Sequence, residues 1–253
     1  AYHDVINADQ PVGYWRPGDP AGSAPAANSG SLGAAANGTP AGTVTFQMPG
    51  AINADADTAI NLDGAQSKID VPFAPELNTT AFTVEAWANV AFGSVGYRSP
   101  VASRDDNPQR GFIFYADPGE NWQFWTGTGE QVGWNIVGGA FVEQGAWAHL
   151  VGTYDGTNKL FYVNGVLVGG NQSRFTPNGA RVLRIGGSAT ESPIGDFFFN
   201  GEVDEVAVYN EALPADRVLA HYTAGSAIAP DPFIPPAFAV QPAPTNNLFK
   251  NET

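Results

Sequence analysis

The sequence predicts an all-β fold: a two-sheet antiparallel jelly-roll sandwich with one short C-terminal helix and an extended, proline-rich tail. Two observations support this prediction. Short apolar runs recur at close spacing up to residue 209, and no helical pattern alternates with them, which excludes the βαβ units of a parallel sheet. Within residues 145–170, an Asp-Gly and an Asn-Gly pair separate three apolar runs, and such pairs supply the positive φ angles of tight hairpins.

Gly, Pro, Asn and Asp, the residues that favour turns, punctuate the expected strands. In chain order, these strands are 44–46, 59–62, 67–71, 82–90, 100–103, 111–116, 121–126, 131–137, 147–152, 160–163, 166–168, 182–185 and 197–209. Residues 19–42 lack large apolar side chains and are expected to form a surface loop. One helix is expected at 214–223, because Pro214 can begin it and Gly225 lies just beyond its end.

Composition limits the classes of function. A length of 253 residues suits one large β domain, and 43% hydrophobic with 14% charged residues favours a packed chain over disorder. A net charge of −14 with only 11 Lys and Arg argues against nucleic acid as a partner. No apolar run reaches the roughly 18–20 residues of a membrane span, so membrane insertion is not expected. The absence of Cys excludes disulfides and thiolate metal sites.

The chain is expected to divide into a jelly-roll domain, residues 1–225, and a tail, residues 226–253. The tail is rich in proline and cannot form a core of its own, yet it carries large apolar residues and must therefore lie against something. We expect it to act as an arm between subunits. The residues expected to make that contact are Phe233, Ile234, Phe238, Val240, Leu248 and Phe249.

Five segments in order along residues 2–225 resemble laminin-G-like, concanavalin A-type jelly rolls of the bacterial or archaeal secreted kind. They are VINADQPVGYWRPGD at 5–19, PGAINADADTAINLDG at 49–64, FTVEAWANV at 82–90, WAHLVGTYDG followed by VNG within 147–165, and GEVDEVAVYNEALPADRVLAHYTAG at 201–225. The resemblance implies an extracellular binding or assembly module rather than an enzyme.

The residues give no catalytic set. Retaining glycosidases of this fold carry two glutamates on one strand, in the pattern E-x-D-x-x-E or E-x-D-x-E. The nearest match begins at Glu202, and Val206 and Ala207 stand where the second glutamate would be. Of the three histidines, His149 in a strand and His221 in the helix are expected to be structural. The sequence therefore predicts that the protein is not an enzyme.

Calcium is the cofactor that the sequence best supports. The resemblance implies a structural Ca²⁺ held by Asp63 of the L-D-G turn and Asp204 of the D-E-V strand, with Asp55 and Asp57 nearby in sequence. The alternative is that Asp63 only makes an Asx-type turn and that Asp204 only hydrogen-bonds to backbone.

A glycan site would use exposed aromatic rings as stacking surfaces beside amides or carboxylates. The candidates are Trp122, Trp125 and Trp134 with Asn121, Gln123 and Asn135. Of these, Trp125, Trp134 and Asn135 are the predicted site, and the alternative for each tryptophan is ordinary core packing. Trp122 and Trp125 differ by three, so they point to opposite faces of a strand and only one can face solvent. The aromatic run 197–199 likewise presents rings to both faces of its sheet.

Two features suggest secretion, and hence an extracellular or cell-surface protein. The chain begins at Ala1 rather than Met, as it would after removal of a signal peptide. It also carries four N-x-[ST] sequons, at Asn37, Asn78, Asn171 and Asn251.

These observations favour a non-catalytic, extracellular structural protein that self-assembles. Copies of the chain would join head to tail into a filament or surface layer, through the tail or an N-terminal arm that packs on a neighbour. The alternative is a secreted glycan-binding or adhesion module, which is the commoner use of this type of fold.

Overall fold

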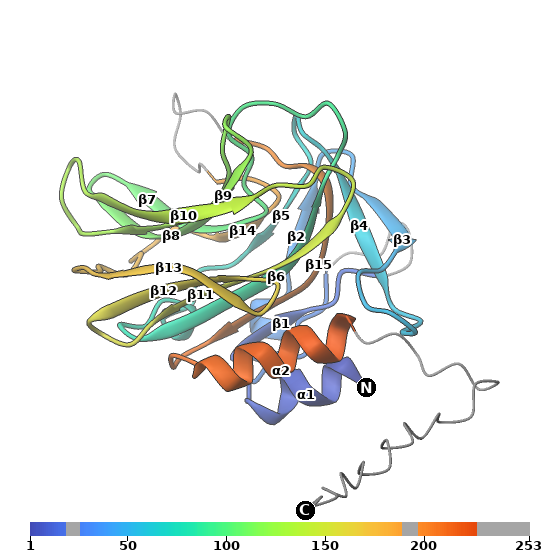
Figure 1. The fold of residues 1–253 in the computed structure, drawn as a ribbon, viewed down its shortest axis with the longest axis horizontal. Coiled ribbons are helices and arrows are strands. Elements are labelled where there is room, and N and C mark those ends of the chain that lie inside the picture. The colour runs from blue at the N-terminus through green and yellow to red at the C-terminus, as the bar shows by residue number, and fades with distance from the viewer. Residues whose placement is uncertain (19–25, 189–196, 227–253) are drawn as a thin grey trace, which may run out of the picture.

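The structure, a computed structural model, describes residues 1–18, 26–188 and 197–226. Two antiparallel sheets stack face to face, and two helices lie against the outer face of one of them (Figure 1). The predicted all-β sandwich with a C-terminal helix is thereby confirmed. The six apolar tail residues and Asn251 lie outside the described residues.

One sheet has eight strands. From edge to edge they are β13 (Val166–Gln172), β12 (Asn158–Val163), β11 (Trp147–Tyr154), β6 (Phe82–Val90), β15 (Asn200–Tyr209), β4 (Thr58–Asp63) and β3 (Thr45–Pro49), with β1 (Gly13–Trp15) paired to β15. The other sheet has seven strands. They are β10 (Trp134–Phe141), β9 (Asn121–Gly127), β8 (Gln109–Ala116), β7 (Val101–Asp106), β14 (Leu183–Ile185), β5 (Lys68–Val71) and β2 (Thr39–Ala41).

The main core fills the space between the sheets. On β6, Phe82 and Val84 alternate with Glu85 and face inward, and Phe82 stacks on Phe112 of β8 with ring centroids 5.1 Å apart. The segment 19–42 was expected to be a surface loop, but its described part contributes to this core through Ala26 and Ala36. It also forms the 3-10 helix Gly33–Ala36 and strand β2. Small side chains can fill a core where backbones approach closely, and a search for large apolar residues misses them.

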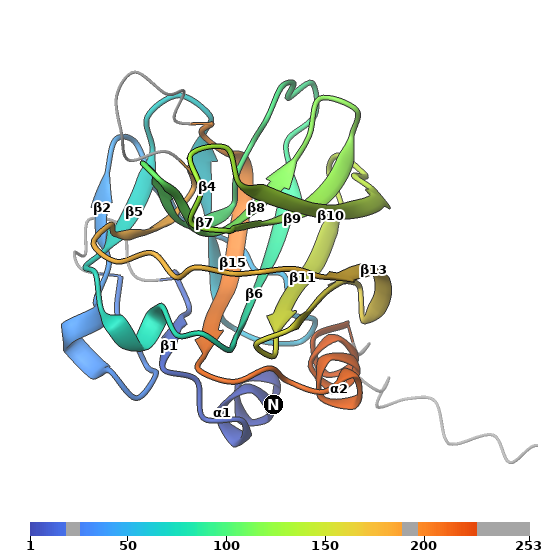
Figure 2. The same cartoon turned by 90° about the vertical axis from the view of Figure 1, so that its left-hand side faces the viewer.

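A second, smaller core lies on the outer face of the eight-stranded sheet, under helices α1 (Tyr2–Ala8) and α2 (Ala215–Ser226). The two helices run side by side there (Figures 1 and 2). Tyr2 and Ile6 of α1 are buried with Val218 of α2. The N-terminal segment therefore packs on its own domain, and β1 continues this by pairing Gly13 with Val208. Both faces of the sheet are covered, which is why strands β6 and β15 are buried along almost their whole length.

Lys159 of β12 is fully buried between the two sheets, near the edge formed by β9 and β10. Its Nζ donates to the carbonyl of Asn135 at 2.8 Å and to that of Phe124 at 3.4 Å, and it lies 5.5 Å from the centre of the Phe124 ring. No carboxylate faces the ammonium group among the contacts of the described residues. Burial therefore lowers the pKa of Lys159 to about 7.

We predict that Lys159 makes stability rise with pH. Between pH 7 and the ordinary lysine pKa of 10.5, the unfolded chain binds a proton that the folded chain releases, so the free energy of unfolding should increase with pH across this window. Lys159→Met should remove that increase and, at pH 6, stabilise the protein by about 1–3 kcal/mol, because a buried charge is replaced by an apolar chain. Urea unfolding at pH 6 to 9.5 measures this effect. Lys68→Met, at a partly exposed lysine, is the control and should keep the wild-type slope; an unchanged slope in Lys159→Met would contradict the prediction.

Candidate functional site

The outer face of the seven-stranded sheet carries a group of aromatic side chains. Alternation along β8 and β9 sends Phe114 and Trp122 into the core and Tyr115 and Trp125 to the outside. Trp134, at the start of β10, lies beside Trp125, with ring centroids 6.2 Å apart. Trp125 and Trp134 are half-buried, whereas Trp122 is fully buried.

These aromatic rings line a pocket of about 140 Å³, which we call the aromatic pocket. Its lining residues are Tyr97, Arg104, Gln109, Tyr115, Trp125, Trp134 and Phe197. Tyr97 stands at its mouth, 37% exposed, and meets the rings of Tyr115, Trp125 and Phe197 edge to face. Phe197 has a φ of 49°, an unusual value for a bulky residue. Its ring lies with the outer aromatic group, whereas the ring of Phe199 lies in the main core.

Arg104 of β7 is the cation of the aromatic pocket and is only 7% exposed. Its guanidinium carbon lies 5.6 Å from the Trp134 ring centre and 5.4 Å from that of Phe197. Nε donates to Asp106 at 2.8 Å. Nη1 donates to the hydroxyl oxygen of Tyr115 at 2.7 Å and to Ser188 at 3.0 Å. The side chain is thus fixed in position before any ligand arrives.

The structure brings together two of the three predicted glycan-binding residues. Asn135 follows Trp134 on β10, so its side chain points to the opposite face, and its carbonyl accepts from Lys159. The amide beside the tryptophans is instead Gln123, whose Oε1 accepts from Trp125 Nε1 at 2.8 Å. Gln123 is among the candidate amides of the sequence, and it lies beside Trp125 because alternate residues of a strand share a face.

The sequence analysis did not nominate Tyr97, Arg104, Tyr115 or Phe197 for the glycan site. Tyr115 lies on β8 and pairs with Gln123 of β9, so only the strand order reveals its place. Tyr97 comes from the loop before β7, and no periodic pattern could have placed it.

Asp63 and Asp204, the predicted calcium ligands, lie apart. Asp63 pairs with Asn200 at one end of β15, four residues or about 13 Å along the strand from Asp204. Burial opposes ionisation of Asp63, but hydrogen bonds from the backbone of Ala65, Gln66 and Ser67 outweigh it and lower its pKa. Asp63 thus makes the Asx-type turn of the alternative interpretation.

Asp204 gathers instead with Glu205 and Asp57, and we call these three residues the acidic cluster. One carboxylate oxygen from each lies within 4.8 Å of the others. Neighbours in a strand normally face opposite ways, but a bulge interrupts the β15–β6 pairing between Asp204 and Ala207, and Glu205 has a φ of 51°. The bulge therefore brings two consecutive carboxylates to one place.

Among the described residues, Arg16 is the basic side chain that contacts the acidic cluster. Its Nε lies 2.9 Å from Glu205 and 3.0 Å from Asp57, and Nη2 lies 3.1 Å from Asp55. Asp204 accepts the backbone N–H of Ala51 at 2.9 Å, and Tyr14 donates its hydroxyl to Glu205. Burial, followed by repulsion from neighbouring carboxylates, raises the pKa of Asp204 to about 7 and that of Glu205 to about 8. One guanidinium leaves part of the negative charge uncompensated.

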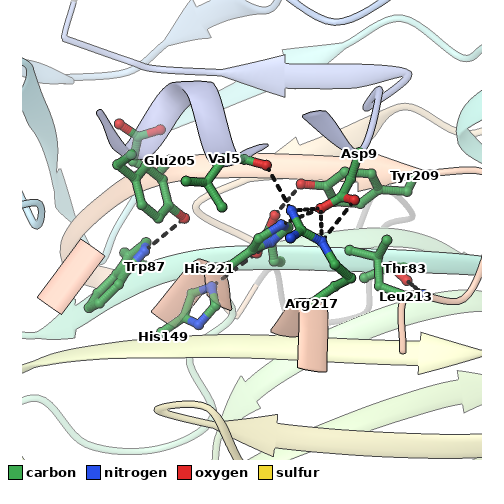
Figure 3. Close-up of polar contacts among 12 residues, drawn as sticks. Val5, Asp9, Thr83, Trp87, His149, Glu205, Tyr209, Leu213, Arg217 and His221 are labelled. Atoms are coloured by element: carbon green, nitrogen blue, oxygen red, sulfur yellow. Dashed lines mark hydrogen bonds and ion pairs between the residues drawn. The ribbon is translucent and has the colours of Figure 1, made fainter. Parts of the chain in front are cut away.

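A third polar group lies under the helices. Figure 3 shows three of its members, His149, Tyr209 and His221, and all three contact Glu85. Glu85 Oε2 lies 3.0 Å from His149 Nε2 and 3.1 Å from His221 Nδ1, and Tyr209 donates to Oε1. The other nitrogen of His221 lies 2.7 Å from Asp9. Because both neighbours of His221 are carboxylates, which only accept, both of its ring nitrogens must carry protons.

Glu85, His149 and His221 are all 0% exposed, so no substrate can reach them in this structure. Both histidines thus have the structural positions that were expected of them. Burial alone would lower the pKa of His221, but Glu85 and Asp9 raise it above the ordinary value. For Glu85, burial likewise opposes charge, and the two histidines overcome it and lower its pKa.

The sequons Asn37, Asn78 and Asn171 are half-buried. Asn78 donates its Nδ2, the atom that would carry a glycan, to the carbonyl of Ala74 at 2.9 Å. Across the described residues, no helix is both long and apolar enough to cross a membrane.

A laminin G-type family model of the concanavalin A-like lectin/glucanases superfamily matches residues 63–219, more than half of the chain. No curated protein matches. Similar solved structures include the receptor-binding domain of botulinum neurotoxin C/D mosaic serotype (11% identity, TM-score 0.63, 85% of this chain and 51% of that chain). Another is the botulinum neurotoxin serotype D binding domain (11% identity, TM-score 0.62, 85% and 51%). A third is the binding domain of botulinum neurotoxin DC in complex with rat synaptotagmin II (10% identity, TM-score 0.63, 85% and 52%). At such identities the likeness concerns the fold, and this chain spans about half the length of those chains.

We predict that Glu85→Gln destabilises the protein by about 3–5 kcal/mol at pH 6, because it removes the buried one of the two carboxylates that pair with His221 and leaves only Asp9. The stabilisation from His221 is complete below its unfolded pKa of about 6.5 and is lost as pH rises through its raised folded pKa. His221→Gln should therefore be most harmful at pH 5.5 and less so at pH 9. Urea unfolding at both pH values measures this, with Glu76→Gln on the surface as the control. Equal losses at both pH values would contradict a charged His221.

Proposed function

Because the chain belongs to the concanavalin A-like lectin/glucanase superfamily, we propose that it is a non-catalytic, extracellular glycan-binding module that binds sugar in the aromatic pocket. The observation that carries this proposal is the pair of half-buried tryptophans, Trp125 and Trp134, beside the fixed guanidinium of Arg104. A concave, mostly aromatic site with a few convergent polar groups is the usual form of a small-ligand site.

The chemistry of the aromatic pocket suits a sugar. The apolar C–H face of a pyranose can cover an indole ring, while its hydroxyls need donors and acceptors at the rim. Arg104 and Gln109 supply these at the lining, and Gln123 lies next to Trp125. Burial raises the pKa of Tyr115 to about 12, so its hydroxyl keeps its proton and remains a hydrogen-bonding group at neutral pH.

Two arguments support a non-catalytic role. No described residue that lines the aromatic pocket is a carboxylate, whereas glycoside hydrolysis by the usual route needs two. The carboxylates of the Glu202–Glu205 segment belong to β15, a strand of the other sheet.

We predict that Trp125→Ala lowers the affinity for a bound glycan at least about tenfold, since a stacking surface at the centre of a site carries a large share of its binding energy. A glycan array followed by calorimetry with the best oligosaccharide measures this. Phe141→Ala is the matched control, because Phe141 is 71% exposed on β10 and does not line the aromatic pocket. Equal loss in both variants, or none in Trp125→Ala, would contradict the proposed site.

We also propose a structural Ca²⁺ at the acidic cluster. The donor set fits this ion, because Ca²⁺ binds carboxylate and carbonyl oxygens, and Asp57, Asp204 and Glu205 offer clustered carboxylates whose charge Arg16 balances only in part. The ion would supply the missing positive charge and would fix the bulge of β15 to the segment around Asp57.

If Ca²⁺ binds there, the melting temperature should rise as Ca²⁺ is added after treatment with chelator. At a concentration one hundred times Kd, the stabilisation should be about 2.7 kcal/mol. Asp57→Asn should weaken the response, and Asp63→Asn, outside the acidic cluster, should retain it. Identical melting of the wild type with and without Ca²⁺ would contradict the proposed ion.

Self-assembly through the tail, the function that the sequence favoured, concerns residues outside those described. The N-terminal arm packs against its own α2 and β15, so the described contacts of this arm are within one chain. Glycan binding is therefore the function for which the described residues provide a site.

A further inference from the structure

The position of Arg104 limits what the aromatic pocket can hold. Its Nε and Nη1 are engaged by Asp106, Tyr115 and Ser188. Nη2 donates to no residue that the structure describes, although the side chain lines the aromatic pocket. The guanidinium is planar, and its bonds at Nε and Nη1 fix that plane, so the remaining nitrogen, Nη2, has a fixed direction; the Trp134 and Phe197 ring centres lie 5.6 and 5.4 Å from the guanidinium carbon.

The charge of the lining is unusual for this protein. The chain has 25 Asp and Glu against 11 Lys and Arg, yet Arg104 is the only charged residue among the described residues that line the aromatic pocket. Asp106 balances Arg104 from the Nε edge and is not part of the lining. A ligand in the aromatic pocket therefore meets a cationic donor and no described carboxylate that would repel an anion.

We propose that the aromatic pocket selects sugars that carry a carboxylate, with the sugar ring against Trp125 or Trp134 and the carboxylate on Nη2 of Arg104. This inference rests on the proposed glycan-binding function. A hydrogen bond between two charged partners is roughly twice as strong as one between neutral partners, and the surrounding rings exclude water from it. A neutral sugar would leave the charged donor with a weaker acceptor.

The probes are oligosaccharides that end in a uronic or a sialic acid, each compared with its own methyl ester, which keeps the ring and removes the charge. Neutral and sulfated oligosaccharides complete the panel. We expect the wild-type protein to bind at least one carboxylated probe about tenfold more tightly than its ester, the ratio expected from one charge-assisted hydrogen bond.

The test variant is Arg104→Gln with Asp106→Asn, which removes the ion pair without leaving a buried charge behind. It should bind the acid and the ester equally. Arg104→Lys with Asp106 kept should lose most of the preference, because an ammonium lacks the planar fork that bonds to Asp106 and Tyr115 while a further nitrogen remains for the ligand. A thermal melt shows that each variant is folded, and Lys68→Met, a charge change outside the lining, should leave the preference intact.

The outcomes separate the two proposals. Equal binding of acid and ester, or binding of neutral or sulfated sugars alone, would overturn the carboxylate preference while leaving the glycan-binding function in place. Binding of no probe in the panel would overturn both. An acid preference that survives in the double variant would show that Arg104 is not its source.

Discussion

The carboxylate of Glu85 is buried on a central strand of the eight-stranded sheet, and segments far apart in the sequence meet on it. His149 comes from the neighbouring β11 and His221 from α2. The other ring nitrogen of His221 hydrogen-bonds to Asp9, the residue that follows α1. An unpaired carboxylate at this depth would cost a large amount of free energy. Separating α2 from the sheet would remove His221 from Glu85 and incur that cost. The order of the outer layer, and with it the fixed position of the N-terminal segment, depends on this one buried charge.

Much of the fold could be predicted because its signals are local. Turn residues and two-residue alternation marked most strands, and Pro214 marked the start of α2, but Gly225, expected just beyond its end, lies inside the helix, which continues to Ser226. Helix α1 was missed because a seven-residue helix has little periodicity of its own and forms by packing on α2. The burial of Ala26 and Ala36 was missed for another reason, because only the path of the backbone shows that these residues reach the core.

The site could be predicted in part. Alternation separated Trp122 from Trp125, but Asn135 was assigned to the wrong side of β10 because adjacency in sequence was taken for adjacency in space. Glu205 joins Asp204 only because of a bulge and its own positive φ, and Asp63, the other predicted ligand, is held in a turn. Groups of site residues that strand order or a bulge brings together cannot be derived from the spacing of residues in the sequence alone.

The first and last described residues both lie with the helices, on the outer face of the eight-stranded sheet (Figures 1 and 2). The residues of the aromatic pocket lie on the outer face of the seven-stranded sheet. The two described ends and the proposed glycan site therefore lie on opposite sides of the domain. A fusion partner, a surface or a bead joined at Ala1 would hold the domain from the helix side and leave the tryptophans facing outward. Several copies fixed side by side could then present their pockets as one multivalent array, and weak single contacts would add up to strong adhesion.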